Sequence, residues 1–157
     1  MVSGKFEKAR DYACRLLSRC GRSEQELAGR LRDKGFEPDV VADVLAHLRS
    51  YGFIDDLSLA REWVRQRLDR RPAGRVLLVW ELRRRGFESD VVEAALAGFG
   101  VEEEYTAALE LARRKMERRG PGYMKRLPAF LHSRGFQYET VRRVCCRLSG
   151  HCVLCQD

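Results

Sequence analysis

The chain contains three stretches of nearly the same sequence, each built around a basic residue followed by glycine and phenylalanine. The glycines are Gly35, Gly86 and Gly135, and they lie 51 and 49 residues apart. A period of this size is typical of repeat proteins, in which each unit buries its apolar face against itself and its neighbours. Three copies within 157 residues leave little room for a separate active site. The repeat therefore favours a binding protein over an enzyme.

The apolar residues of each copy follow the spacing of an α-helix. Leucines stand eight and four residues before each glycine, which places them on one side of a middle helix that ends at the glycine. A second apolar stripe, such as Val40, Val41, Val44 and Leu45, follows each glycine and indicates a last helix. The residues expected in the core are Leu27, Leu31, Val41, Leu45, Leu78, Leu82, Val92, Leu96, Leu127, Leu131 and Val141.

No segment alternates apolar and polar residues with the two-residue period of a strand. We therefore predict an all-α fold of nine helices, arranged as three tandem three-helix repeats that form an elongated, curved rod. The predicted domains are residues 1–54, 55–100 and 101–149, followed by a flexible, cysteine-containing tail over residues 150–157.

Several residues indicate where the helices begin and end. Opening helices are expected over residues 6–19, 56–70 and 102–119, and middle helices are expected to start at Ser23, Gly74 and Tyr123. Ser23 and Glu26 have the spacing of a capping box, and Asp55 or Asp56 is the expected N-cap of the second opening helix. The apolar stripe of the second copy extends its last helix as far as Phe99. Each repeated glycine suits a helix end with positive φ.

The net charge of +7 comes from the last third of the chain. Residues 1–60 hold ten basic and ten acidic side chains, and residues 61–104 hold nine of each. Residues 105–157 hold eleven basic and four acidic side chains. Such lopsided charge indicates a polyanion or an acidic protein surface as partner, with a merely solvated face as the alternative.

Two clusters of basic residues are candidate binding sites. The second copy carries a cluster suited to an acidic protein surface: Arg65, Arg67, Arg70, Arg71, Arg83, Arg84 and Arg85. The third copy carries a cluster suited to phosphate contact without sequence specificity: Arg113, Arg114, Lys115, Arg118, Arg119, Lys125, Arg126, Arg142 and Arg143. The last helices of the first two copies begin with acidic residues such as Glu37 and Asp39, so DNA would repel them as recognition helices.

Catalytic and metal-binding groups are sparse. The three histidines lie in different copies, and none has a recognisable nucleophile beside it. His151, Cys152 and Cys155 have metal-ligand character, but no second Cys-x-x-Cys completes a structural site. Cys145 aligns with core leucines of the other copies, so we expect it to be a small core residue. We expect no enzyme activity, no cofactor and no bound metal.

The sequence also predicts where the protein is found. The longest apolar run, residues 76–80, is far shorter than the roughly 20 residues of a membrane span. The first residues lack the apolar segment of a signal peptide. We therefore expect a cytoplasmic protein that does not contact membranes and that keeps its six cysteines reduced.

The most specific motif lies between the first and second copies. It reads Gly52-Phe-Ile-Asp-Asp-x-x-x-Ala-x-x-Trp-Val-x-x-Arg67. Together with Arg22-Ser-Glu-Gln-Glu-Leu27 and Leu31-x-x-Lys-Gly-Phe36, it resembles RecX, the bacterial regulator of the RecA recombinase. The resemblance extends over roughly residues 7–149 and is weakest in the third copy, where Thr140 and Cys145 replace aliphatic residues.

This resemblance implies a negative modulator that binds in the groove of the RecA–DNA filament and limits filament growth, strand exchange and the associated ATPase activity. Such a protein would take part in homologous recombination, DNA repair and the SOS response. Its expected partners are RecA, the RecA–DNA filament and single- or double-stranded DNA, and we expect it to act as a monomer. The second-copy cluster would contact the filament, and the third-copy cluster would contact DNA phosphates. The alternative is a helical repeat protein that binds DNA without sequence specificity and acts without RecA.

Overall fold

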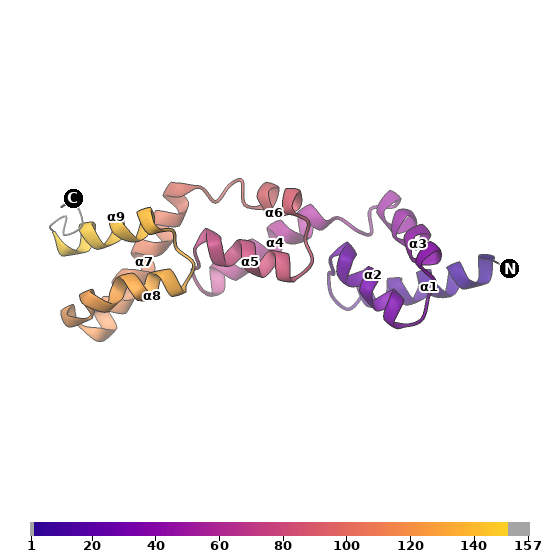
Figure 1. Ribbon diagram of the computed structural model, residues 1–157, viewed down its shortest axis with the longest axis horizontal. Helices are drawn as coiled ribbons and strands as arrows, with labels where there is room; N and C mark the ends of the chain where they lie inside the picture. The colour runs from indigo at the N-terminus through magenta and orange to yellow at the C-terminus, as the bar shows by residue number, and fades with distance from the viewer. Residues whose placement is uncertain (1, 151–157) are drawn as a thin grey trace. The chain divides into compact units, whose positions relative to one another are not determined.

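The computed structural model describes residues 2–150, and all regular secondary structure within that range is helical (Figure 1). The elements are α1 (Val2–Leu17), α2 (Glu24–Asp33), α3 (Pro38–Ser50), α4 (Asp56–Arg70), α5 (Arg75–Arg84), α6 (Ser89–Ala95), α7 (Val101–Arg119), the 3-10 helix η1 (Pro121–Arg126), α8 (Leu127–Ser133) and α9 (Tyr138–Ser149). The described residues therefore have the predicted all-α fold, with three successive groups of three α-helices.

The chain divides into two compact units. Unit 1 comprises Met1–Glu62 and Leu82–Ala95, and unit 2 comprises Trp63–Glu81 and Leu96–Asp157. Helices α4 and α5 each continue from one unit into the other, so the second repeat contributes residues to both. The division into domains at residues 54 and 100 stays a prediction.

Each unit has a core of aliphatic side chains from the predicted stripes. In unit 1, the buried leucines and valines of α2 and α3 pack with Ala9 and Ala13 of α1 and with Ile54. In unit 2, the buried residues of α8 and α9 pack with Ala108 and Ala112 of α7. All eleven residues predicted for the core are buried. The prediction was correct because helical periodicity alone decides which side of each helix is apolar.

The repeated glycines end the middle helices as predicted. Gly35, Gly86 and Gly135 have φ values of 91°, 83° and 78°, which only glycine adopts without strain. The N–H of the phenylalanine that follows each glycine donates to the carbonyl of the leucine four residues before that glycine, at 3.2, 3.3 and 3.3 Å. This is the Schellman motif, and it satisfies carbonyls that a helix end leaves open.

The third middle helix begins later than predicted. The α-helix starts at Leu127 rather than Tyr123, and the 3-10 helix η1 precedes it. Pro128 accounts for the change, because it has no N–H for the carbonyl of Met124 and its ring crowds that carbonyl. An α-helix that continued from Tyr123 through this position would lose a hydrogen bond.

The last helix of the second repeat is shorter than predicted. Helix α6 ends at Ala95 instead of reaching Phe99. Gly98 and Gly100 lie just beyond it, and glycine costs roughly 1 kcal/mol relative to alanine within a helix. The Phe99 N–H instead closes a turn onto the Leu96 carbonyl at 2.9 Å. The arginine at the start of α5, Arg75, donates to the carbonyls of both residues at 3.0 and 3.2 Å.

The start of α2 is bonded to the second repeat within unit 1, and we call this contact the first joint (Ser23, Glu24, Asp56, Arg85 and Gly86). Ser23 is the N-cap of α2 in the predicted capping box, and its hydroxyl donates to the Arg85 carbonyl at 2.7 Å. The Glu24 N–H donates to the Asp56 carboxylate, at 3.0 and 3.2 Å from its two oxygens. Partial burial raises the pKa of Asp56. The joint therefore occupies donors that a helix start leaves open.

The start of α5 is bonded to the third repeat within unit 2 in the same way, and we call this contact the second joint (Gly74, Arg75, Val76, Glu104, Arg134 and Gly135). The N–H groups of Gly74 and Val76 donate to the carbonyls of Arg134 and Gly135 at 2.9 and 3.1 Å. The Arg75 N–H donates to Glu104 Oε1 at 2.8 Å. The two joints use equivalent carboxylates, because Asp56 and Glu104 each stand four residues before a buried alanine.

The second joint contains a buried polar pair. Glu104 and Thr140 are only 3% and 2% exposed, and the Thr140 hydroxyl donates to Glu104 Oε2 at 2.6 Å. Both Glu104 oxygens therefore have a donor, as burial of a carboxylate requires. Threonine replaces the aliphatic residue of the other repeats at position 140 because it supplies this hydroxyl.

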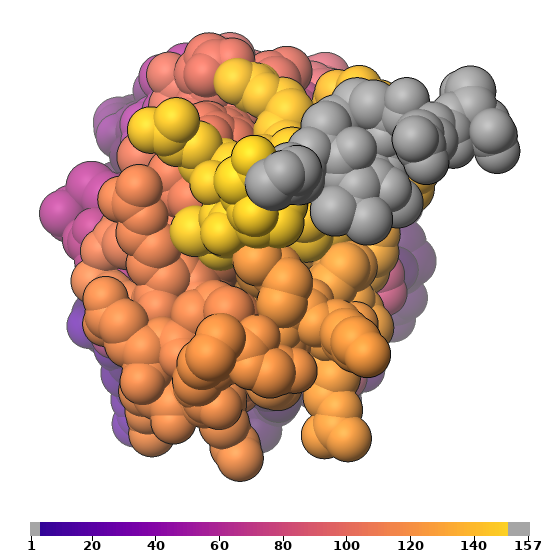
Figure 2. Space-filling model, turned by 90° about the vertical axis from the view of Figure 1, so that its left-hand side faces the viewer, coloured from indigo at the N-terminus to yellow at the C-terminus, as the bar shows by residue number. Residues whose placement is uncertain are grey.

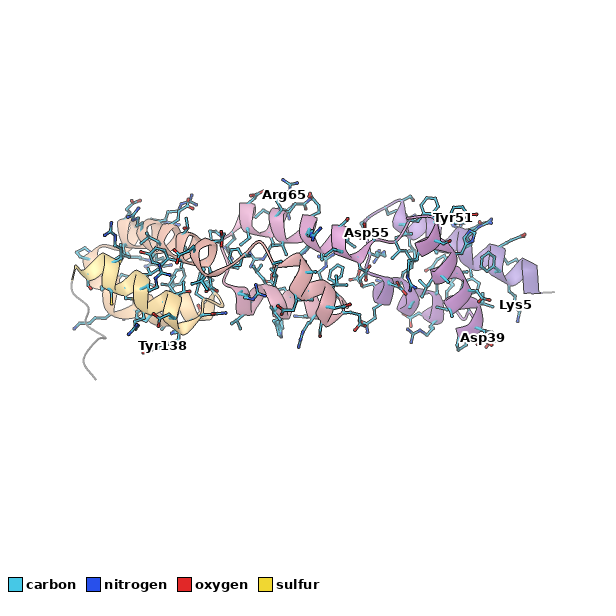
Figure 3. The ribbon with its side chains drawn as sticks, turned by 90° about the horizontal axis from the view of Figure 1, so that it is seen from above. Lys5, Asp39, Tyr51, Asp55, Arg65 and Tyr138 are labelled. Atoms are coloured by element: carbon cyan, nitrogen blue, oxygen red, sulfur yellow. The ribbon has the colours of Figure 1, made fainter. Side chains whose placement is uncertain are left out.

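The two acidic residues at the start of α4 have separate roles. Asp55 lies just before the helix (Figure 3) and accepts bonds from the backbone N–H and hydroxyl of Ser58, at 3.0 and 2.7 Å. These bonds lower the pKa of Asp55. Asp55 is therefore the N-cap of α4, whereas Asp56 belongs to the first joint.

Replacing Gly135 by alanine should destabilise the protein more than replacing Gly35. Both substitutions place a Cβ at positive φ, which costs about 1–2 kcal/mol. Nothing lies within 4 Å of a Cβ at Gly35, whereas one at Gly135 would lie 2.4 Å from the Leu77 Cβ and backbone nitrogen. Overpacking of this kind adds about 1–3 kcal/mol. Urea unfolding of the two variants measures the difference, and equal losses would show that the second joint is not tightly packed.

Replacing Asp55 by asparagine should make the acid sensitivity of the protein weaker. The native state lowers the pKa of Asp55 from its ordinary value of 3.8, so the ionised carboxylate stabilises the fold above that value and loses this effect as the pH falls through the lower folded pKa. Asparagine still accepts a bond at the N-cap but has no charge. Asp55→Asn should be less stable than the parent at pH 7, and the difference should disappear as the pH falls through the lowered pKa of the folded state. Urea unfolding across this range is the measurement, with Asp43→Asn on the exposed face of α3 as control; a pH-independent difference would contradict the capping role.

Candidate interaction surfaces

The basic residues predicted to contact phosphate all lie in unit 2, but they do not form one uniform surface. Their positions are Arg113, Arg114, Lys115, Arg118 and Arg119 on α7, Lys125 and Arg126 on η1, and Arg142 and Arg143 on α9. Several have acidic or aromatic partners inside the unit, whereas others extend into solvent. The difference separates structural residues from candidates for binding.

The two arginines of α9 are ion-paired. Arg142 bonds Glu139 at 3.0 Å, and this bond raises the pKa of Arg142. Arg143 bonds both oxygens of Glu102 at 2.9 and 3.3 Å, and its guanidinium lies 4.3 Å from the centre of the Tyr105 ring. The Arg143 bond lowers the pKa of Glu102. A phosphate would have to compete with these carboxylates.

Two residues in the middle of α7 also have partners. Arg114 forms an ion pair with Glu110, one turn earlier on the same helix. The ammonium of Lys115 lies over the rings of Phe130 and Tyr123, 4.6 and 5.5 Å from their centres. A cation over an aromatic face is stabilised there by roughly 0.5–2 kcal/mol. Lys115 is therefore half-buried and contributes to the packing of α7 on η1 and α8.

The end of α7 and the following 3-10 helix carry four exposed basic residues, which we call the α7–η1 cluster (Arg118, Arg119, Lys125 and Arg126). Within residues 2–150, none of the four has a carboxylate partner. Figure 2 shows a face of unit 2 in which the side chains of α7, η1 and α8, in orange, adjoin those of α9, in yellow. Arg113 is also exposed, one turn earlier on α7. This cluster has the charge that phosphate contact requires.

The second-repeat cluster divides between the two units. Arg65, Arg67, Arg70 and Arg71 lie in unit 2, and Arg65 extends from α4 with an ion pair to Asp69 at 3.8 Å (Figure 3). Arg67 is mostly buried, with 19% of its side chain exposed, and bonds Glu81 of α5 at 2.9 and 3.2 Å. Arg67 therefore holds α4 against α5, and Arg70 and Arg71 are exposed.

The other three arginines of this cluster lie in unit 1. Arg83 and Arg84 are exposed on the last turn of α5, and Arg83 donates to the Ser89 hydroxyl at 3.1 Å. Arg85 is half-buried, and its carbonyl belongs to the first joint. Arg83 and Arg84 are thus the better candidates for contact with a partner.

The described residues offer little for chemistry of other kinds. No group of three or more His, Cys, Asp or Glu residues between positions 2 and 150 could hold a metal ion. A cleft of about 410 Å³ in unit 1 and one of about 270 Å³ in unit 2 have no serine, cysteine or histidine in their linings. The predicted tail residues His151, Cys152 and Cys155 lie outside the described residues.

Cys145 packs against the core of unit 2, where burial raises the pKa of its thiol. Within the described range, no helix is long and apolar enough to cross a membrane.

Two structural features, the joints and the exposed side of α5, were not predicted from the sequence. The joints pair backbone groups with carboxylates up to 32 residues away, although the equivalent positions of Asp56 and Glu104 were visible in the sequence. Val76 and Trp80 were expected only as part of an apolar run, yet the structure exposes both on α5.

Known proteins share both the helical fold and the sequence of this chain. Two family models match the chain: RecX, first three-helix domain, over residues 9–48, and RecX, second three-helix domain, over residues 55–96. The regulatory protein RecX of Treponema pallidum strain Nichols is 41% identical over 137 residues, which cover 87% of this chain and 82% of that protein. The chain belongs to the RecX family.

Other RecX proteins extend the likeness along the chain. The regulatory protein RecX of Chlorobaculum tepidum is 32% identical over 142 residues, covering 90% of this chain and 89% of that protein. The crystal structure of RecX from Lactobacillus salivarius has a TM-score of 0.86 at 19% identity and covers 94% of this chain and 98% of that chain. At this identity the structural likeness shows the fold, and the sequence matches show the family of regulatory proteins.

Proposed function

We propose that this RecX protein is a negative modulator of RecA. It binds in the groove of the RecA–DNA filament and limits filament growth, strand exchange and the associated ATPase activity, without catalysis of its own. Membership of the RecX family is the observation that carries this proposal. The protein would act as a monomer in the cytoplasm, where homologous recombination, DNA repair and the SOS response take place.

The arrangement of charge supports contact with both components of such a filament. The α7–η1 cluster presents four basic side chains that suit DNA phosphates. Arg83 and Arg84 lie in unit 1, beside a last helix that begins with acidic residues, and suit an acidic protein surface better than DNA. Several weak contacts made by one chain would together give a high overall affinity for a partner with repeated binding surfaces.

A protein that binds DNA without RecA is the second candidate, because the α7–η1 cluster alone accounts for phosphate binding. The two candidate functions predict different binding preferences, for RecA filaments or for bare DNA. RecA–single-stranded-DNA filaments and RecA-free DNA are sedimented in parallel with the protein. A preference for filaments supports the modulator, and equal or stronger binding to bare DNA supports the alternative.

Variants of the two basic surfaces should have separable effects. Reversal of Arg83 and Arg84 to Glu should weaken inhibition of RecA strand exchange and leave affinity for free DNA nearly unchanged. Replacement of Arg118 and Arg119 by Ala should lower affinity for free DNA and reduce the salt dependence of log K by about two, since each phosphate contact contributes about one. Arg142→Ala is the matched control, because Arg142 is already paired with Glu139.

Two outcomes would count against the proposal. If both double variants inhibit RecA as well as the parent, these surfaces do not bind the filament. If the parent protein fails to inhibit RecA, the proposed function itself is wrong.

A further inference from the structure

Helix α5 exposes two large apolar side chains. Val76 and Trp80 are 58% and 54% exposed and stand four residues apart, which places them on one face of the helix. Leu78, between them in the sequence, is fully buried. The longest apolar run of the chain therefore packs one side into the protein and presents the other to solvent.

The segment of unit 2 that ends with Trp80 and Glu81 has a net positive charge. Its neighbour Glu81 is bonded by Arg67, whose Nη1 also donates to the Arg71 carbonyl at 2.6 Å. These bonds hold the last turn of α4, with exposed Arg70, and the exposed Arg71 that follows it beside α5. Residues 63–81 contain five arginines and two acidic residues, a net charge of +3. Both acidic residues, Asp69 and Glu81, are ion-paired with arginines of α4.

We infer that Val76 and Trp80 anchor a partner protein whose surface has an apolar pocket with acidic residues around it. Tryptophan and arginine are enriched among the residues that dominate the binding energy of protein interfaces, and an apolar centre with a polar rim is the usual arrangement. The net positive charge of residues 63–81 favours a partner of opposite charge. Under the proposed function, on which this inference rests, the acidic surface belongs to RecA in the filament.

A protein occupant fits this face better than a nucleic acid does. Bases stack on aromatic rings, and Trp80 alone would serve for that. Val76 offers no ring to stack on, and its exposed aliphatic surface is satisfied only by other apolar groups. The pair therefore matches a pocket rather than a strand of bases.

Hydroxyl-radical footprinting read by mass spectrometry tests this inference on the unmodified protein. The protein is oxidised alone at several concentrations, with single-stranded DNA, and with RecA–single-stranded-DNA filaments, after co-sedimentation has measured filament binding. Trp80 should be protected by filaments only. Tyr51, which is 68% exposed in unit 1 (Figure 3), should stay reactive throughout and serves as the reference.

A pair of matched variants measures the strength of the anchor. Trp80→Ala should weaken filament binding by about tenfold or more, the effect of losing an interface hot spot. Tyr51→Ala removes another exposed aromatic ring elsewhere and should change binding by less than about twofold. Circular dichroism of both variants checks that the helices are intact.

Each other outcome overturns the inference in a different way. Filament binding without protection of Trp80, or with unchanged affinity of Trp80→Ala, rejects this anchor and leaves the proposed function standing. Protection by DNA alone would identify bases as the occupant, and protection that is lost on dilution would identify a second copy of the chain. Absence of filament binding by the parent protein would reject both the proposed function and the partner named here.

Discussion

The N–H groups at the starts of the middle helices determine how each repeat is attached to the next. A helix start leaves four backbone donors open. In α2 one of them, the Glu24 N–H, bonds a carboxylate of the following repeat, and the Ser23 hydroxyl bonds a carbonyl there. In α5, backbone N–H groups bond both a carboxylate and two carbonyls of the following repeat. The second joint needs glycine on both sides, because a Cβ on Gly74 would lie 2.1 Å from the Gly135 carbonyl oxygen. Side-chain cores hold α1–α3 and α7–α9 together, and the joints bond the second repeat to each of these groups within its unit.

Intramolecular pairing also decides which charges remain for partners. Glu81, Glu102 and Glu139 are each bonded by an arginine, and buried Glu104 belongs to the second joint. Four exposed basic residues without such a partner in the described chain, Arg118, Arg119, Lys125 and Arg126, lie together where α7 ends and η1 begins. The outward charge of this chain is thus set by how its acidic residues are paired inside the fold, and not by composition alone.

Most of the fold could be predicted, because helical periodicity and glycine helix ends are local properties of the sequence. The errors were local as well: Pro128 delays the start of α8, and α6 ends early. The candidate site was less predictable. A cluster of arginines is visible in the sequence, but the bond between Arg143 and Glu102 joins residues 41 positions apart and cannot be read from it. Nothing in the sequence distinguishes Arg67, which is mostly buried, from the exposed arginines near it. Which side of the run at residues 76–80 meets solvent depends on neighbouring helices that the sequence alone does not place.

The central claim, that helix starts join the repeats, is tested most directly by amide hydrogen exchange. The amides of Glu24 and Arg75 stand at helix starts and donate within the joints, at 3.0 and 2.8 Å. The first amides of α9, at Tyr138 and Glu139, are the internal reference, because the Gln137 side chain does not cap this helix. Glu24 and Arg75 should be protected nearly as well as the helix interiors, while Tyr138 and Glu139 exchange fast. Exchange of Glu24 and Arg75 at the rate of the α9 start would contradict the account.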